Sequence, residues 1–330
     1  MSQSVAKLVT VAIPVYKSLA YLSEALKSVN LQDYPYIELI VSDNGMNGSK
    51  VRDLVCQHYF KPYKFRQNPT SVPVVEHFNQ LIQAASGEYF VLLCDDDEIS
   101  PNYVSELVSA LEAHPSASVA ISHQEVIDRA SQVISTSTNK LLGLMTGQDF
   151  IRRWNLGQHG FKCFVTNLAR TSEIRTLGGY PDFPRGFHSD SGLLMKLCLG
   201  RDVIVSEACT FRWRVHGTSN GDTTNVQDLT VATQQFMRFL LEDHHFQAFA
   251  KAHTQKWCFL QDDLVSLEWN IYVRKWQSAL GRELSVQEKL KAALSMPLVL
   301  RYYRRHPRLW IKEFLPMFHK MYRQVRYKGA

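Results

Sequence analysis

Segments typical of strands and of helices alternate through roughly the first 115 residues, and this alternation constrains the fold more than any other feature. Residues 8–15 form an apolar, β-branched run typical of a strand buried on both faces. Residues 18–29 place apolar side chains on one helical stripe, with Ser18 as the candidate N-cap. Further strands are predicted at residues 37–41, 63–66 and 89–94, and further helices at residues 50–58, after Pro73 and after Pro101. The alternation predicts a mainly parallel, Rossmann-like central sheet flanked by helices.

The pattern changes after residue 117 and becomes helical toward the C-terminus. Strands are predicted at residues 119–127, 161–168 and 208–215, and helices at residues 147–155 and 189–199. After Asp228 the chain is predicted to be helical almost to its end. We therefore expect an α/β domain over residues 1–227 and a helical C-terminal region over residues 228–330.

Composition and cysteine placement are those of a cytosolic globular protein. Hydrophobic residues make up 45% of the 330 residues and charged residues 21%, which is ordinary for a soluble protein. The short polar segment 1–7 lacks the apolar region of a signal peptide, and no stretch reaches the about 18 apolar residues of a spanning helix. The six cysteines are scattered without a C-x-x-C pair, which argues against a zinc site or a disulfide framework.

Four consecutive carboxylates, Asp95 to Glu98, follow the predicted strand at residues 89–94. Ligands of open α/β sheets bind at the carboxyl ends of strands, so clustered carboxylates there favour a divalent cation that also contacts phosphates. The alternative is an acidic loop that opens the next helix, where the helix dipole favours negative charge. The chain has neither G-x-G-x-x-G after its first strand nor G-x-x-x-x-G-K-[ST]. A nucleotide would therefore be bound through carboxylates and a cation rather than through a glycine cradle.

Two other carboxylates and one basic segment are candidates for the same site. Asp43 follows the strand at residues 37–41, so in a parallel sheet it shares an edge with the acid run. Asp190 precedes an apolar helix, where it serves as an N-cap, as a functional carboxylate, or as both. Alternation places Arg212, Arg214 and His216 on one face of a strand. That face suits a diphosphate or a metal, or it is the exposed face of an edge strand.

The remaining histidines and hydrolase motifs carry less information. His244, His245 and His253 lie in the helical region without a carboxylate at ligand spacing, and we interpret them as surface or packing residues. Neither H-E-x-x-H nor G-x-S-x-G occurs, so zinc-protease and α/β-hydrolase functions have no support.

The order and spacing of these motifs resemble the family 2 glycosyltransferases, which are inverting nucleotide-sugar enzymes with the GT-A fold. The resemblance covers roughly residues 8–220 and is carried by seven segments: Val11-Ala-Ile-Pro-Val-Tyr16, Leu26-Lys-Ser-Val29, Ile37 to Gly45, Gly87 to Asp97, Gly178-Gly179-Tyr180, Ser189-Asp190 and Arg214-Val-His216. It implies a GT-A catalytic domain over residues 1–227, followed by the helical extension.

The resemblance also implies roles for individual residues. Asp190 matches the base that deprotonates the acceptor hydroxyl, and Asp97, with Asp95 and His216, matches the metal site for Mn²⁺ or Mg²⁺. The nucleotide-binding positions implied are Pro14, Tyr16, Asp43, Asp95 and Asp96, and the diphosphate-binding positions are Arg212, Arg214 and His216. Cys94 stands where many members have the first acid of a longer D-x-D-D pattern, which leaves open which of the three aspartates binds the metal.

The function implied is transfer of one sugar from a nucleoside diphosphate donor to a glycan hydroxyl. UDP is the default nucleotide, with dTDP and GDP open, and a lipid-linked acceptor in O-antigen, capsule or related polysaccharide synthesis is expected. Two other functions remain open at this point. A metal-dependent nucleotidyltransferase would use the same edge carboxylates but would not need Asp190, and a non-catalytic glycan- or nucleotide-binding scaffold would need no base.

The C-terminal segment is strongly basic and amphipathic. Residues 301–330 hold nine Lys or Arg and one Glu, so the net charge of this segment is +8. The first 300 residues have a net charge of −2, which gives +6 for the whole chain. Residues 311–325 place apolar side chains on one helical stripe, interrupted by Pro316. This pattern favours an anionic membrane surface and a peripheral location at the cytoplasmic face of the cell membrane. A packed C-terminal helix with a solvated basic face is the alternative, and no motif supports nucleic-acid binding.

Overall fold

The computed structural model describes residues 7–136, 141–156, 165–217, 225–311 and 314, and the chain divides into two compact units, Met1–Ser219 and Asn220–Ala330. The strands of the first unit are β1 (Val9–Val15), β2 (Ile37–Asp43), β3 (Tyr63–Gln67), β4 (Tyr89–Leu92), β5 (Glu98–Ile99), β6 (Ala117–Ile127), β7 (Val133–Thr136), β8 (Gly143–Thr146), β9 (Leu168–Arg170) and β10 (Asp202–Arg214). Its helices are α1 (Leu22–Asn30), α2 (Lys50–His58), α3 (Val74–Ala84), α4 (Tyr103–Ala113), α5 (Gly147–Asn155), α6 (Thr171–Thr176) and α7 (Ser189–Cys198), with a 3-10 turn, η1, at Pro184–Gly186.

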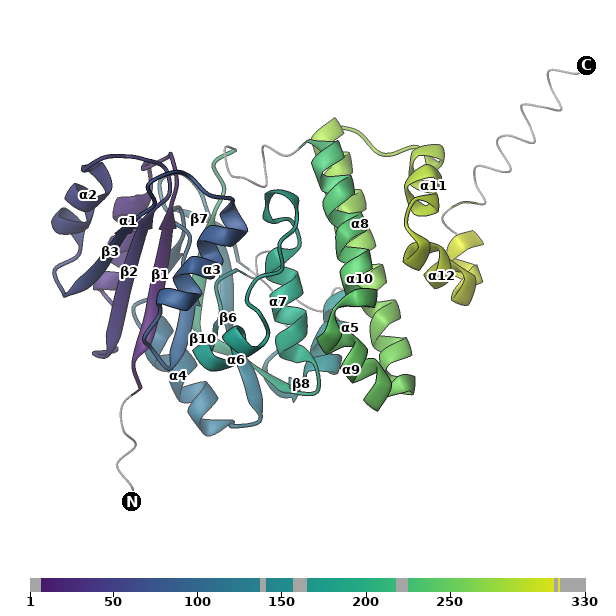
Figure 1. Cartoon of the computed structure of the whole chain (residues 1–330), viewed down its shortest axis with the longest axis horizontal. Coiled ribbons are helices and arrows are strands. Elements are labelled where there is room, and N and C mark those ends of the chain that lie inside the picture. Colours follow the sequence, from purple (N-terminus) through teal and green to yellow (C-terminus); the bar gives the residue numbers. More distant parts are fainter. Residues whose placement is uncertain (1–6, 137–140, 157–164, 218–224, 312–313, 315–330) are drawn as a thin grey trace, which may run out of the picture. The chain divides into compact units, whose positions relative to one another are not determined.

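One sheet of the order β3-β2-β1-β4-β9-β6-β10-β5 organises the first unit, with β7 beside β6 and β8 beside β10. Figure 1 shows β3, β2 and β1 side by side at one end of this sheet. Strands β1 to β4 are parallel to one another, and β6 is parallel to β10. The short strand β9 is antiparallel to both β4 and β6, so these two strands run in the same direction. Six strands therefore end at one edge of the sheet, which we call the carboxyl edge. The predicted, mainly parallel sheet is confirmed.

The sheet is covered on both faces. One face packs against α1, α2 and α4 through a core that includes Val11, Val41, Val91, Leu26 and Leu107. Val11 of β1 is paired with Val91 of β4, whereas Val41 of β2 is paired with Ile13 of β1. Removal of these apolar side chains from water stabilises the packed sheet. The other face carries α3, because His77 of α3 contacts Ser42 across 2.8 Å and the side chain of Ser42 points opposite to that of Val41. Burial lowers the pKa of His77 to about 4, so this core histidine is neutral.

Two local predictions, for residues 18–29 and 161–168, differ from the structure, and β1 accommodates a proline near its end. Helix α1 begins at Leu22 rather than at residue 18, and its N-cap is Tyr21. Pro14 does not end the β1 ladder: β1 pairs with β2 through Val15, whereas the pairing with β4 stops at Ala12, and the missing N–H of Pro14 falls on the β4 side. The strand predicted at residues 161–168 begins at Leu168, and residues 161–164 lie outside the described residues.

The second unit is helical. Its helices are α8 (Val226–Glu242), α9 (His244–Ala252), α10 (Thr254–Leu280), α11 (Val286–Leu294) and α12 (Pro297–Arg305). The long helix α10 packs against α8, α9 and α12 through buried aromatic and aliphatic side chains such as Phe236, Phe246 and Leu264. Among the described helices, none is long and apolar enough to cross a membrane.

The basic segment predicted at residues 301–330 is described only up to Ile311 and at Phe314. Helix α12 buries Tyr302 and Tyr303, and the Tyr302 hydroxyl donates to Ser266 Oγ on α10 at 3.2 Å. Arg301, Arg304 and Arg308 are exposed. The amphipathic helix predicted at residues 311–325 therefore falls almost wholly outside the described residues.

Candidate active site at the carboxyl edge of the sheet

The loops that follow β1, β2 and β4 meet at the carboxyl edge. The backbone N–H of Tyr16, just after β1, donates to the Asp95 carboxylate at 3.4 Å, and the Tyr16 carbonyl accepts from the Asn47 side chain. The approach is so close that a Cβ at Gly45 would lie 2.0 Å from the Tyr16 carbonyl oxygen. Glycine is therefore required at position 45 for the two loops to meet. The Tyr16 side chain is 51% exposed, whereas Pro14 is buried within β1.

Asp43 is fully buried at the end of β2, and its carboxylate organises the loop after this strand. Oδ1 accepts from the Gly45 N–H and the Asn47 side chain, both at 2.8 Å. Oδ2 accepts from the Asn47 N–H at 3.0 Å and from Gln67 Nε2 at 3.2 Å. A carboxylate has about four acceptor positions, and protein donors occupy four here. An exposed side chain, Gln67, makes the longest of these bonds, so a nucleotide base that contacts Asp43 would displace Gln67 first. Sequence reasoning did not identify Asn47 or Gln67.

The three aspartates after β4 have different neighbours. Asp95 faces the Tyr16 backbone, as described above. Asp96 pairs with His216, whose Nε2 lies 2.9 Å from Asp96 Oδ2. Asp97 is 2% exposed, and its Oδ1 accepts from the backbone N–H of Arg214 at 2.9 Å. The structure thus brings His216 to Asp96, whereas the sequence associated His216 with Asp95 and Asp97 as metal ligands.

The electrostatics of the acid run favour a cation. Burial, followed by repulsion from Asp96, raises the pKa of Asp95 to about 8 and that of Asp97 well above its ordinary value. Crowded carboxylates that resist ionisation become good ligands once a positive charge is added. Ligand atoms of Cys94, Asp96 and Asp97 lie within 4.8 Å of one another. The carboxylate oxygens of Asp96 and Asp97 fit Mn²⁺ or Mg²⁺, which prefer oxygen ligands, better than the Cys94 sulfur does.

Arg214 is enclosed by protein groups at the end of β10. Its side chain is 0% exposed, and Nη2 forms a short ion pair with Glu98 Oε1. Nε donates to the Asp96 carbonyl at 2.7 Å, and Nη1 donates to the Asp128 carbonyl at 2.8 Å. In this environment the guanidinium faces the protein interior, and its predicted contact with a diphosphate stays a prediction.

Arg212 remains near the surface of the sheet. It lies in register with Glu98 of β5 on one side and Glu125 of β6 on the other. Its Nε is 2.9 Å from Glu125 Oε2, and the side chain is 37% exposed. A cross-strand pair of this exposure contributes little to stability, so Arg212 can change partner without a large cost.

A turn after β6 and an aromatic ring complete the surroundings of His216, and sequence reasoning identified neither. The Asp128 carboxylate accepts from the N–H groups of Ala130 and Gln132, and Arg129 Nη2 donates to the His216 carbonyl at 2.7 Å. The Tyr21 ring lies 5.1 Å from the His216 ring. The available signal was the segment Asp128-Arg-Ala-Ser131, whose turn-forming residues directly follow a predicted strand.

Asp190 approaches the same edge from α7. Ser118 Oγ, near the start of β6, donates to the Leu197 carbonyl at 2.6 Å, which places the C-terminal end of α7 at the opposite edge. Gly186, just before α7, lies close to the first turn of α3, because a Cβ at position 186 would be 3.1 Å from the Val74 side chain. Helix α3 begins at the carboxyl edge, so the segment before α7 lies at this edge too. The half-buried Asp190 is thus carried at the carboxyl-edge end of α7.

The start of α7 fixes Asp190 firmly. The N-cap is His188, in a left-handed conformation with φ of 65°, so the interpretation of Asp190 as the N-cap is wrong. Asp190 occupies the first turn, where the helix dipole favours its negative charge, and its Oδ1 accepts from the Ser191 N–H at 2.8 Å. Arg185 also has a positive φ, of 57°, and such strained residues often accompany functional sites.

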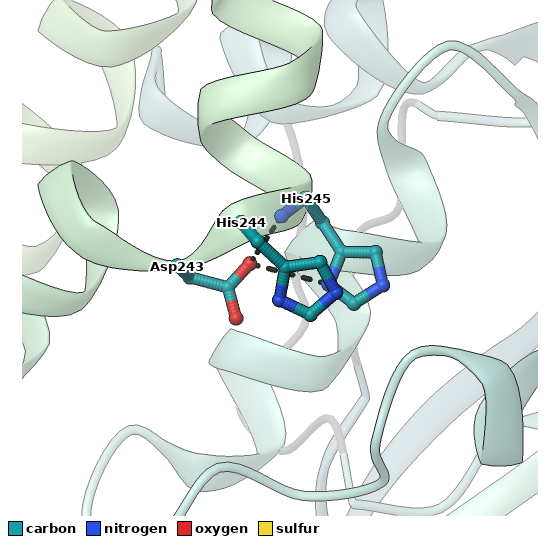
Figure 2. Close-up of side chains that lie close together, drawn as sticks. All are labelled: Asp243, His244 and His245. Atoms are coloured by element: carbon teal, nitrogen blue, oxygen red, sulfur yellow. Dashed lines mark hydrogen bonds and ion pairs between the residues drawn. The ribbon is translucent and has the colours of Figure 1, made fainter.

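A second cluster of polar side chains lies in the helical unit. Figure 2 shows Asp243, His244 and His245 together, with ligand atoms within 4.8 Å of one another. The prediction that these histidines lack a nearby carboxylate is wrong, because Asp243 Oδ1 lies 3.3 Å from His245 Nδ1. The same oxygen accepts from the N–H groups of His245 and Phe246 and caps α9. A cation here would face the positive end of the helix dipole, so we assign the cluster a capping role.

Comparison with known proteins identifies the family. The family model described as Glycosyl transferase family 2 matches residues 10–172. An uncharacterized glycosyltransferase of Rickettsia typhi is 30% identical over 282 residues, which cover 83% of this chain and 84% of that protein. The chain belongs to glycosyltransferase family 2. The resemblance seen in the sequence is thereby confirmed, and with it the class of enzyme.

Two other relatives of the glycosyltransferase match over shorter regions. The putative glycosyltransferase EpsE of Bacillus subtilis is 26% identical over 179 residues, 52% of this chain and 59% of that protein. The GalNAc(5)-diNAcBac-PP-undecaprenol beta-1,3-glucosyltransferase of Campylobacter jejuni is 31% identical over 108 residues, 30% of this chain and 33% of that protein. The chain thus spans less than two thirds of the length of either relative.

Solved structures confirm the GT-A fold. TarS residues 1–349 from S. aureus, in complex with UDP-GlcNAc, superposes with a TM-score of 0.60 at 15% identity, covering 90% of this chain and 89% of TarS. The mannosyltransferase PcManGT of Pyrobaculum calidifontis, in complex with GDP-Man and Mn²⁺, gives a TM-score of 0.55 at 17% identity, covering 94% and 89%. At such identities the likeness concerns the fold alone.

Proposed function

We propose that this glycosyltransferase moves one sugar from a nucleoside diphosphate donor to a hydroxyl group of a glycan, with inversion at the anomeric carbon and with a divalent cation. The observation that carries the proposal is the convergence of Asp43, the acid run and His216 at the carboxyl edge, with Asp190 arriving there on α7. Ligand sites of open α/β sheets lie at this edge. The catalytic domain proposed is residues 1–227, with residues 228–330 as a helical extension.

The proposed chemistry needs one base and a stabilised leaving group. Asp190 takes the proton from the acceptor hydroxyl, whose oxygen bonds to the anomeric carbon as the bond from that carbon to the diphosphate oxygen breaks. The nucleoside diphosphate departs with the bonding electrons. Mn²⁺ or Mg²⁺, held by Asp96 and Asp97 with His216 nearby, would offset the charge on this leaving group. Asp43, Asp95 and Tyr16 are the residues proposed to bind the nucleoside, and Arg212 and His216 are the candidates for the diphosphate.

The donor class can be tested by thermal shift. The protein is melted with UDP, dTDP, GDP and their sugar conjugates, each with Mn²⁺ or with EDTA. A ligand at about 100 times its dissociation constant stabilises the folded state by about 2.7 kcal/mol, so a rise of a few degrees is expected for one nucleotide. We expect UDP to give this rise and EDTA to abolish it.

The same panel distinguishes the other candidate functions. Stabilisation by a nucleoside triphosphate rather than a diphosphate would instead indicate a nucleotidyltransferase. A flat response to every nucleotide would leave only the non-catalytic scaffold. Stabilisation that persists in EDTA would overturn metal dependence but not nucleotide binding.

We further propose a lipid-linked glycan acceptor and a location at the cytoplasmic face of the cell membrane, in surface polysaccharide synthesis. The name of the C. jejuni relative describes an undecaprenol-linked acceptor. In this chain the exposed Arg301, Arg304 and Arg308 begin a segment of net charge +8. Each Lys or Arg near an anionic bilayer contributes about 1 kcal/mol of binding.

Membrane binding can be tested by flotation. We expect the full chain to float with vesicles that contain anionic phospholipid, to remain behind with neutral vesicles, and to be released by high salt. A chain that ends at residue 310 keeps α12 but loses the whole apolar stripe of residues 311–325 and half of the segment's charge of +8, and should no longer float. Equal flotation of the two chains would contradict the proposal.

A further inference from the structure

We propose that Arg214 is a positioning residue, which holds the acid run and His216 in the geometry that receives the cation, and that it is not a ligand of the donor diphosphate. The inference rests on the proposed function of this edge. It deepens that function by separating the residues that contact the ligand from the residue that arranges them.

The hydrogen bonds of the guanidinium carry the first step. An arginine side chain has five N–H donors. Nε and Nη1 bind the carbonyls of Asp96 and Asp128, while Nη2 binds both the Glu98 carboxylate and Ser131 Oγ, the latter at 3.1 Å. Four of the five donors thus have protein acceptors. A diphosphate would need these same N–H groups, and burial of the side chain keeps it out of reach.

The second step is that Arg214 contacts three consecutive residues of the acid run. Its guanidinium binds the Asp96 carbonyl and the Glu98 carboxylate, and its backbone N–H donates to the Asp97 carboxylate at 2.9 Å. Asp96 in turn is 2.9 Å from His216 Nε2. Arg214 therefore fixes both the path of the acid run and the direction in which Asp97 points.

The surrounding groups join the same network. The Tyr21 ring lies under the guanidinium, 4.6 Å from Cζ, and 5.1 Å from the His216 ring. On the other side, the turn at residues 128–132 receives Nη1 through Asp128 while Arg129 holds the His216 carbonyl. The buried Arg214 guanidinium thereby connects the loop after β4, the start of α1, the turn after β6 and the end of β10.

The charge of Arg214 also explains how the acid run is tolerated. Asp95, Asp96, Asp97 and Glu98 are consecutive carboxylates, two of which are strongly desolvated. A fixed positive charge in contact with Glu98 and with the Asp96 carbonyl lowers the cost of crowding them. Lysine would retain the charge, but its ammonium cannot bind two carbonyls and a carboxylate in one plane.

The test compares Arg214→Lys with a matched control, Arg175→Lys. Arg175 also binds several backbone carbonyls, those of Ile82, Gln83 and Ala85 at the end of α3, away from the carboxyl edge. We expect Arg214→Lys to weaken Mn²⁺ binding about 10–100-fold, measured by electron paramagnetic resonance without nucleotide, as for loss of other groups that orient metal ligands. Arg175→Lys should bind Mn²⁺ like the unaltered protein.

Two further readouts keep the inference falsifiable. Hydrogen exchange of the metal-free protein should speed up at residues 95–98 and 128–132 in Arg214→Lys alone. If that variant does not fold, Glu98→Gln, which removes only the ion pair, should shift Mn²⁺ affinity in the same direction. Should Arg214→Lys keep its Mn²⁺ affinity and instead lose affinity for UDP at saturating Mn²⁺, Arg214 would be a diphosphate ligand and the inference would be overturned. If no nucleotide binds at all, the proposed function fails while the Mn²⁺ and exchange measurements still decide the role of Arg214.

Discussion

Replacing Asp190 with asparagine is expected to lower sugar transfer by about 10²–10⁴-fold, because a positioned general base contributes a factor of this size. The amide retains the shape of the side chain and its acceptor oxygen for the Ser191 N–H, but it cannot take a proton from the acceptor hydroxyl. Donor affinity should be essentially unchanged, since the nucleotide is bound by residues after β1, β2 and β4. The loss therefore appears in turnover and not in donor binding.

The measurement is release of the nucleoside diphosphate with a panel of polyprenyl-diphosphate-linked oligosaccharides, together with donor binding by calorimetry. Asp53→Asn is the matched control. Asp53 is an exposed carboxylate in the first turn of α2, so its loss removes the same helix-dipole interaction without touching the carboxyl edge. Equal turnover of Asp190→Asn and Asp53→Asn would remove Asp190 from the mechanism.

The fold was predictable because its main signals are local. Apolar runs such as residues 8–15 and 89–94 specify buried strands, and their spacing to the intervening helices specifies parallel pairing. The three residues of β9 carry no such signal. Strand β9 lies antiparallel between β4 and β6 and pairs with the edges of both strands. Its position therefore depends on the tertiary structure and not on its own sequence.

The candidate site was predictable as a set of residues but not as a set of contacts. Strand ends identified Asp43 and the acid run, because parallel strands share an edge. Alternation placed Arg214 and His216 on one face, yet it could not show that β5, Tyr21 and the turn after β6 would cover Arg214. For the same reason the pairing of His216 with Asp96 depends on side-chain positions that no sequence spacing specifies.

The acid run should also give a pH dependence of stability that a cation reverses. The folded-state pKa of Asp95, about 8, and that of Asp97 both lie above the ordinary value of 3.8. At intermediate pH the folded protein therefore binds more protons here than the unfolded chain does. The protonated carboxyls contribute their full stability when the pH is below the ordinary pKa of 3.8. This contribution is lost as the pH rises through the folded-state pKa of Asp95, about 8.

We therefore expect the melting temperature of EDTA-treated protein to decrease as the pH rises from about 5 to about 9, because these carboxyls lose their protons. Mn²⁺ should raise it most at the alkaline end, because the cation binds deprotonated carboxylates and its binding releases protons. Asp97→Asn removes one titrating carboxyl and one proposed ligand. It should flatten the alkaline decline and raise the Mn²⁺ concentration needed for half-maximal stabilisation at least about tenfold.

Asp33→Asn, which neutralises an exposed carboxylate, is the control for a simple change of net charge. Other groups titrate over the same range, so the informative quantity is the difference between the melting curves of the unaltered protein and Asp97→Asn. That difference isolates the Asp97 carboxyl. An Asp97→Asn protein that keeps both the alkaline decline and the Mn²⁺ midpoint would show that Asp97 is neither strongly perturbed nor a ligand. The cation would then have to be sought at the pair of Asp96 and His216, whose Oδ2 and Nε2 atoms lie 2.9 Å apart.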